Sequence, residues 1–295
     1  MPDSVLVTGA TGTVGRHLTE LLCGRAVPVR AMVRDTGRAA AVLPAAARTV
    51  PGDLTDPAAV ADALDGVRTA FVVLADDAGE AFAQAAEKAT ALRHLVVVSA
   101  DAPQDSAHRG PLFARHADGE TRLLATGVPV TVLRPAPFAT QALAWAADLA
   151  VGDTVGVVHP DLAVPVIDPR DVAEAAAAVL RGPAPVRRRI LALSGPDLLD
   201  VPARVDIIGA VLGRRLSVTR LEPDAWVARV VGRVPAAYAR GLLDVERYLY
   251  ERRLPVVPTV RQITGRPPRP FRTWAEDHAA AFGAPVRGRS SKEAP

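Results

Sequence analysis

The sequence predicts an α/β protein in which a doubly wound parallel sheet carries a smaller, mostly helical cap. Over the first 135 residues, short apolar runs alternate six times with segments of helical periodicity. The runs are continuously apolar, which is typical of strands covered on both faces. After Pro135, prolines become frequent and the helical segments lengthen. Strands that alternate with helices indicate a parallel sheet with crossover helices. The frequent prolines and longer helical segments after Pro135 indicate the cap.

The expected strands comprise residues 4–8, 28–33, 47–50, 69–74, 94–99 and 130–134. The expected helices between them include the segments VGRHLTELL, DPAAVADAL, GEAFAQAAEKATAL and GETRLLATG. We expect one domain over residues 1–135, a cap over residues 136–283 and a flexible tail over residues 284–295. Within the cap portion, the chain is expected to re-enter the sheet domain around residues 164–195.

Composition and charge exclude several classes of protein. The chain has 35 Lys and Arg residues against 32 Asp and Glu, dispersed without interleaved aromatics, so a nucleic-acid-binding surface is not expected. Cys23 is the one cysteine, which excludes an intramolecular disulfide and a Cys-rich metal site, and no bound metal is expected. No apolar run approaches the roughly 20 residues that cross a bilayer. No signal peptide precedes the first strand, so we expect a cytoplasmic protein.

A glycine-rich loop, TGATGTVG at residues 8–15, follows the first expected strand directly. Gly9 permits a tight turn, Gly12 lets the backbone approach a pyrophosphate, and Gly15 lets the next helix pack closely. Free N–H groups and the helix dipole favour an anion at the start of that helix. The context predicts a dinucleotide site of the Rossmann type, and the alternative is a glycine-rich turn without a ligand. The expected cofactor contacts in this loop are Gly9, Thr11, Gly12, Thr13 and Val14.

The end of the second expected strand indicates which dinucleotide binds. An acidic residue there selects the ribose 2′-hydroxyl of NAD, whereas a basic residue can pair with the 2′-phosphate of NADP. The strand ends at Arg34, followed by Asp35, and a planar guanidinium suits a phosphate. The sequence therefore predicts NADP(H), bound through Arg34. The alternative is a solvated Arg34 with Asp35 as the ribose ligand.

The segment Gly52-Asp53-Leu54 follows the third expected strand, at the position where folds of this type hold the adenine. The Asp53 carboxylate can accept a hydrogen bond from the exocyclic amine, and Leu54 can cover the ring. The alternative is that Asp53 only begins a turn, with Asp56 as the cap of the next helix. We also expect cofactor contacts from Leu74 and Ala75, where the fourth strand ends.

These features together resemble the extended and atypical short-chain dehydrogenases, most closely the NmrA-like branch. The segments that carry the resemblance are TGATGTVG (8–15), VRD (33–35), GDLTD (52–56), VVVSA (96–100), GETRLLATGVPVTVLRPAPF (119–138) and IDPRDVAEAA (167–176). The resemblance implies a Rossmann domain with a small substrate-binding cap. It also implies that Pro135 and Ala136 border the nicotinamide carboxamide and that Phe138 walls the substrate pocket.

The catalytic residues of such enzymes are present only in part. Family members that do chemistry usually carry a serine together with a Tyr-x-x-x-Lys motif. Ser99 matches the serine, but an alignment on Glu120 puts Leu112 at the tyrosine position and His116 at the lysine position. We expect Ser99 to position a carbonyl, and His116 to bond the nicotinamide ribose and relay a proton. The alternatives are that Ser99 only holds a strand end and that His116 only touches cofactor.

The predicted function is that of an NADPH-dependent ketoreductase acting on a bulky, largely apolar carbonyl or quinone. Ketoreductases that tailor aromatic polyketides in antibiotic biosynthesis resemble this pattern, a glycine-rich NADP site without the Tyr-Lys pair. The main alternative is a non-catalytic NmrA-like sensor of NADP(H) that binds a protein partner. A nucleotide-sugar epimerase is disfavoured because its mechanism relies on the missing tyrosine. We expect a monomer or a weak homo-oligomer, with no nucleic-acid or membrane partner.

Overall fold

A computed structural model of the chain describes residues 4–74, 78–101, 110–182 and 189–283. Ala75 and the predicted tail lie outside the described residues. The structure contains a seven-stranded sheet in the order β3-β2-β1-β4-β5-β6-β8, in which every neighbouring pair is parallel. The strands are β1 Val5–Val7, β2 Val29–Val33, β3 Ala47–Pro51, β4 Thr69–Val73, β5 His94–Val98, β6 Val130–Pro135 and β8 Ile190–Leu193. The predicted doubly wound α/β fold is confirmed.

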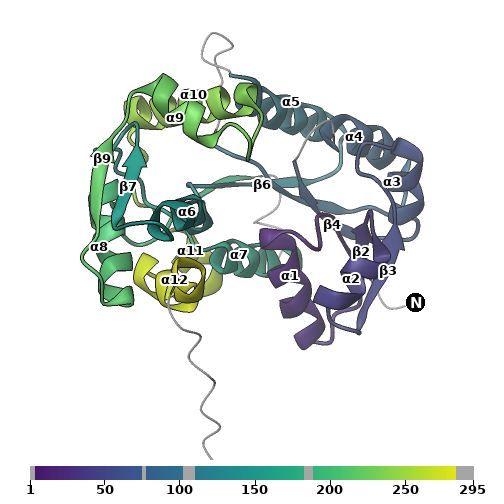
Figure 1. Cartoon of the computed structure of the whole chain (residues 1–295). Coiled ribbons are helices and arrows are strands. Elements are labelled where there is room, and N and C mark those ends of the chain that lie inside the picture. Colours follow the sequence, from purple (N-terminus) through teal and green to yellow (C-terminus); the bar gives the residue numbers. More distant parts are fainter. Residues whose placement is uncertain (1–3, 75–77, 102–109, 183–188, 284–295) are drawn as a thin grey trace, which may run out of the picture.

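Helices cover both faces of the sheet, and two apolar cores result. Figure 1 shows α3, α4 and α5 along one side and α1 and α7 along the other. The bounds are α1 Thr13–Gly24, α2 Thr36–Val42, α3 Pro57–Leu64, α4 Ala78–Lys88, α5 Pro111–Ala125 and α7 Pro169–Arg181. In β1, Val5 and Val7 pack toward α1 and α7, whereas Leu6 packs toward α3 and α4. Burial on both faces explains why the strands read as continuous apolar runs.

The remaining elements form a smaller part with its own core. They are η2 Ala139–Trp145, α6 Ala146–Leu149, β7 Thr154–Val157, α8 Val201–Leu212, β9 Ser217–Arg220, α9 Pro223–Val230, α10 Ala236–Arg252, α12 Phe271–Asp277 and η4 Ala279–Phe282. Helix α11 Thr259–Thr264 instead packs through Val260 and Ile263 into the core beside α1 and α7. Trp274, which is 1% exposed, lies in this core. The strands β7 and β9 pair in parallel, a small sheet that the sequence analysis did not predict.

Several helices begin at an aspartate whose side chain accepts a backbone N–H of the first turn. Asp35 accepts from Arg38, and Asp56 accepts from Ala58. Such caps satisfy donors that the helix leaves unpaired at its start. In the described part of the chain, no helix combines the length and the apolar character that a bilayer crossing requires.

Candidate cofactor and active site

The sequence-predicted cofactor residues lie at one edge of the sheet. Gly9 follows β1, Arg34 follows β2, Asp53 comes two residues after β3, and Ser99 follows β5. Because all these strands are parallel, their carboxyl ends share one edge. The chain order reverses between β1 and β4 there, which is where ligands bind in open α/β sheets.

The phosphate loop has the geometry of an anion site. Gly9 has a φ of 56°, in the left-handed region that favours glycine. A Cβ atom on Gly15 would lie 2.2 Å from the carbonyl oxygen of Gly9, so position 15 admits no side chain. Helix α1 begins after Gly12, without a side-chain cap and without an acidic residue in its first turn. Its N–H groups and dipole are therefore available to a pyrophosphate.

A cavity of about 420 Å³ lies over this loop. Thr11, Gly12 and Thr13 line it from the loop, and Thr140 and Leu143 line it from η2. The cavity therefore adjoins both the phosphate loop and the smaller part of the molecule. Its position and the cradle of glycines fit the pyrophosphate of a dinucleotide.

Two residues of α1 have positions that were not predicted from the sequence. The exposed Arg16 also lines the cavity and adds a positive charge that was not identified, although it stands directly after the glycine motif. Val14 is 6% exposed, and its side chain packs into the sheet core. A contact of Val14 with a cofactor is thereby restricted to its backbone.

Arg34 and Asp53 lie at the adenosine end of the edge. Arg34 is exposed, whereas the Asp35 carboxylate accepts a hydrogen bond of 3.0 Å from the N–H of Arg38. That role in capping α2 favours Arg34 over Asp35 as the ligand of the ribose substituent. Hydrogen bonds from Thr55 (2.9 and 2.8 Å to Oδ1) and, more weakly, the charge of Arg34 lower the pKa of Asp53. Asp53 thus begins a turn, which was the alternative given in the sequence analysis. Its Oδ2 makes no hydrogen bond to the described residues and can accept one from an adenine amine.

Ser99 and His116 each carry a buried polar atom without a partner. Ser99 is 4% exposed, and its Oγ has no hydrogen bond within the part of the chain that the structure describes. The same holds for Nδ1 of His116, on α5. Burial lowers the pKa of His116, against the opposing charge of Glu120, so the imidazole is neutral near pH 7. A buried polar atom without a partner costs about 1–3 kcal/mol, which a bound ligand can offset.

The sixth strand brings Pro135 and Ala136 to the same edge, and Phe138 follows. The Ala136 N–H donates to Leu193 on β8 at 2.7 Å. Phe138 is half-buried and packs against the core between the sheet, α1 and α7. The Leu74 side chain is buried and would meet a Cβ on Gly119 of α5 at 2.9 Å, so it packs under α5 and leaves only its backbone for a cofactor.

An ion pair fixes α5 to the end of β6. Arg134 donates two hydrogen bonds to Glu120, of 3.0 Å from Nε and 2.6 Å from Nη2. The Glu120 side chain is 5% exposed. This bidentate contact sets the position of α5, the helix that carries His116, relative to the sheet edge.

Tyr248 is a residue near the site that the sequence analysis missed. Its ring, on α10, contacts Phe113 edge to face at 5.0 Å. It packs with Ala100 and Ala117, the neighbours in sequence of Ser99 and His116. Burial and then the charge of Asp101 raise its pKa, so the phenol stays protonated. No local pattern could reveal this contact, because α10 is far from α5 along the chain.

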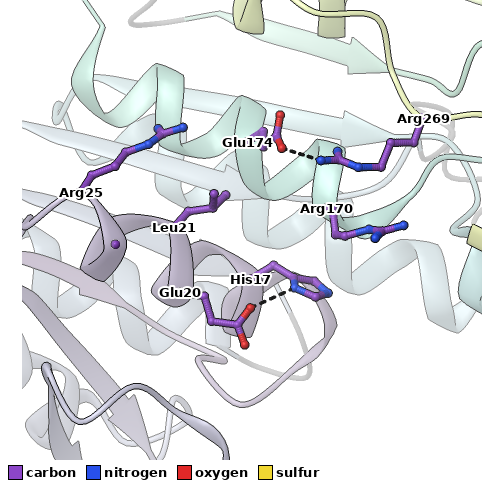
Figure 2. Close-up of a pocket in the computed structure, with 8 residues that line it drawn as sticks. His17, Glu20, Leu21, Arg25, Arg170, Glu174 and Arg269 are labelled. Atoms are coloured by element: carbon purple, nitrogen blue, oxygen red, sulfur yellow. Dashed lines mark hydrogen bonds and ion pairs between the residues drawn. The ribbon is translucent and has the colours of Figure 1, made fainter. Parts of the chain in front are cut away.

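A second cavity, of about 430 Å³, lies between α1 and α7 (Figure 2). Two pairs of its charged side chains lie close together, and a third lining residue, Arg170, pairs with Asp168 and Asp277 outside the lining. Glu174 accepts from Arg269 at 2.7 Å, and His17 lies 3.3 Å from Glu20. Neither Ser99 nor His116 lines this cavity. It shares His17 and Arg170 with the cavity over the phosphate loop. The described residues also contain no group of three or more His, Cys, Asp or Glu side chains placed to hold a metal.

Comparisons with known proteins agree with this geometry. The NmrA-like family matches residues 1–257. A reductase of Streptomyces griseus, named (4-alkanoyl-5-oxo-2,5-dihydrofuran-3-yl)methyl phosphate reductase, is 36% identical over 281 residues, 94% of this chain and 99% of the relative.

Two solved structures share the fold. An NADPH-dependent quinone oxidoreductase of Escherichia coli, complexed with NADPH, gives a TM-score of 0.81 at 20% identity, over 92% of this chain and 99% of that one. The negative transcriptional regulator NmrA in complex with NADP gives 0.76 at 19% identity, over 96% and 98%. The chain belongs to the NmrA-like family.

Proposed function

We propose that the protein is an NADPH-dependent ketoreductase that reduces a bulky, largely apolar carbonyl or quinone. The observation that carries the proposal is that Ser99 Oγ, at the sheet edge, and His116 Nδ1, on α5, are buried without a hydrogen-bond partner among the described residues. Trp274 Nε1, in the core of the smaller part, is unpartnered among these residues as well. Buried polar atoms in native structures nearly always make a hydrogen bond. The two atoms of Ser99 and His116 therefore indicate groups that bind a ligand. The S. griseus relative is likewise named a reductase.

NADPH, when bound, supplies a hydride to the carbonyl carbon. The residues of the chain bind the cofactor and orient the substrate carbonyl. The α1 N-terminus holds the pyrophosphate, and Arg34 pairs with the 2′-phosphate. The Ser99 hydroxyl donates a hydrogen bond to the carbonyl oxygen, where negative charge develops. His116, as a neutral imidazole, bonds a hydroxyl of the nicotinamide ribose.

The oxygen must also receive a proton, so that the carbonyl becomes an alcohol. The tyrosine that usually donates it is replaced by Leu112. Two groups beside the site can supply the proton, namely Tyr248, which packs next to the neighbours of Ser99 and His116, and a relay through His116. General acid catalysis contributes about 10²–10⁴-fold.

The apolar character of the smaller part supports a bulky substrate. From the segment after β6, the apolar side chain of Leu143 lines the cavity over the phosphate loop, and Trp145 is half-buried nearby in the chain. A polycyclic aromatic polyketide, of the kind used in antibiotic biosynthesis, is the substrate class that we propose. Apolar walls with a few placed polar groups are the usual form of such sites.

A non-catalytic NADP(H) sensor is the second candidate. The absence of the Tyr-x-x-x-Lys motif and the shared fold with the regulator NmrA favour it. Such a sensor would bind NADPH without oxidising it and would change its affinity for a protein partner with the redox state of the cofactor.

NADPH oxidation with a panel of quinones and polycyclic hydroxyketones tests the proposal. Ser99→Ala and His116→Ala should each lower kcat by about tenfold to a hundredfold. Ser217→Ala, at an exposed position of β9, serves as the matched control and should leave kcat unchanged. Tight NADPH binding without turnover of any acceptor would favour the sensor. Turnover that neither site variant changes would keep the enzyme but reject these two residues as its catalytic groups.

A further inference from the structure

Arg204 is a buried arginine whose terminal nitrogens make no hydrogen bond to any residue that the structure describes. The residue, on α8, is 6% exposed. Its Nε donates to the carbonyl oxygen of Asp200 at 3.2 Å, and its guanidinium lies 5.4 Å from the centre of the Trp145 ring. Among the described residues, Nη1 and Nη2 have no hydrogen-bond acceptor, and neither is a fully enclosed atom. Arginine is rarely buried without using its donors, so four N–H groups are available to something else.

Glu246, on α10, and Asp200, at the start of α8, are the two acidic residues whose charges favour the charged form of this arginine. Burial raises the pKa of Glu246 to about 7, with Arg204 opposing the shift. Burial lowers the pKa of Arg204 to about 10, which Glu246 and Asp200 oppose. No N···O distance within 4.0 Å joins the two side chains in the described structure. The two groups influence each other but do not form an ion pair.

The elements that hold these groups belong to the substrate-side core. Trp145 ends η2, which begins directly after Phe138, and it packs in the core of the smaller part. Helix α10 carries both Glu246 and Tyr248, and Tyr248 contacts the helix of His116. Trp145 and Glu246 therefore lie on elements that run from the candidate active site into the smaller part, and Arg204 of α8 lies against the Trp145 ring.

We propose that Arg204, Glu246 and Trp145 form an anion subsite that binds a phosphate monoester on the substrate. The inference rests on the proposed reductase function and refines it, because the substrate would then join an apolar body to one phosphate group. A phosphate offers several acceptor oxygens, which suit the two free nitrogens of Arg204. Protonated Glu246 adds an O–H donor. A carboxylate ligand has only two oxygens, so it would use the donors of this subsite less fully than a phosphate. Trp145 supports the guanidinium from its ring face.

Calorimetric titration of the NADP⁺-loaded full chain with phenyl phosphate tests the subsite directly. Phenol and benzoate are the neutral and carboxylate comparisons, and phenyl phosphate should bind the tightest of the three. Arg204→Gln should weaken phenyl phosphate binding by about tenfold or more. Arg247→Gln, on the exposed side of α10, is the matched control and should leave the affinity unchanged. Absence of binding to the wild type, equal affinity for benzoate, or an unchanged affinity in Arg204→Gln would each overturn the proposal.

Glu246→Gln is a variant that should increase the affinity for phenyl phosphate. At about pH 8.5 the Glu246 carboxyl is mostly ionised in the wild type, and its charge repels the phosphate. The glutamine is a neutral donor at every pH, so Glu246→Gln should bind phenyl phosphate about tenfold more tightly there and about equally near pH 5.5. Equal affinities at both pH values would contradict the role of Glu246. Turnover of a neutral quinone by the wild type is measured in parallel. A neutral quinone does not use the subsite, so the absence of quinone turnover would count against the reductase function alone.

Discussion

Gly15 shows at the scale of one residue how the phosphate loop is built. A side chain there would meet the carbonyl oxygen of Gly9 at 2.2 Å, and a backbone atom cannot move aside without displacing the loop. Gly15→Ala should therefore lower NADPH affinity by about tenfold or more, together with thermal stability. Gly24→Ala, in the last turn of the same helix, meets nothing within 4 Å and should be neutral or stabilise by about 0.4–1 kcal/mol. Similar behaviour of the two variants in cofactor titration would refute this reading of the loop.

We propose at the same scale that Arg34 selects NADP(H) over NAD(H). It is exposed at the end of β2, while Asp35 is engaged in capping α2. Removal of a charge-assisted hydrogen bond costs about 1.5–3 kcal/mol. Arg34→Ala should therefore weaken NADPH binding by about tenfold to a hundredfold and leave NADH binding unchanged.

The control for this change is Arg48→Ala, at an exposed position of the neighbouring strand β3. It should change neither affinity. Equal losses for NADPH and NADH in Arg34→Ala would show that the arginine does not read the 2′-phosphate.

At the scale of elements, the sequence predicted the sheet closely and the smaller part less well. The six predicted strands all occur, with ends within one or two residues of those predicted, because strands buried on both faces are continuously apolar. Strands β7 and β9 have four residues each, and β9 has three exposed positions. They produce no such run, so the two-stranded sheet could not be predicted from pattern.

The Glu120–Arg134 contact joins α5 to β6 and provides an element-scale prediction. Because the Glu120 side chain is 5% exposed and that of Arg134 16%, Glu120→Gln leaves a half-buried arginine without its counter-charge. Breaking a buried pair in this way costs about 3–5 kcal/mol, measurable by urea denaturation. The nearby pair of Glu80 and Arg122, at 3.6 Å, is about half exposed. Glu80→Gln should therefore cost no more than about 1 kcal/mol, and comparable losses in both variants would contradict the account.

At the scale of the whole molecule, Glu246 links stability to pH. Its pKa of about 7 in the folded chain lies above the ordinary value of 4.5. The folded state thus holds the proton more tightly than the unfolded state. The stabilisation is complete below about pH 4.5 and is lost as pH rises through 7, by about 3 kcal/mol. Glu246→Gln cannot ionise, so its unfolding free energy should fall less between pH 5 and 8.5 than that of the wild type, and identical pH slopes would count against the assignment.

The whole molecule also explains which site residues could be predicted. Residues at the ends of parallel strands, such as Arg34, Asp53 and Ser99, can be placed from strand order alone, since the strand ends share one edge. Tyr248, and Arg204 of the proposed anion subsite, could not be placed in this way, because α10 and α8 take their positions from the packing of the smaller part. Side-chain direction was also beyond the sequence, as the buried side chains of Val14 and Leu74 show.

The transfer of deuterium from NADPH labelled at C4 of the nicotinamide tests the central claim most directly. The purified protein is incubated with the label on the transferred face and with each quinone or hydroxyketone of the panel, and the products are examined by mass spectrometry. A reductase of the kind proposed yields an alcohol or hydroquinone and NADP⁺, and an alcohol product from a ketone carries one deuterium on the former carbonyl carbon. Tight NADPH binding with the label retained on the nicotinamide, for every acceptor, would contradict the account and identify the protein as a sensor of NADP(H).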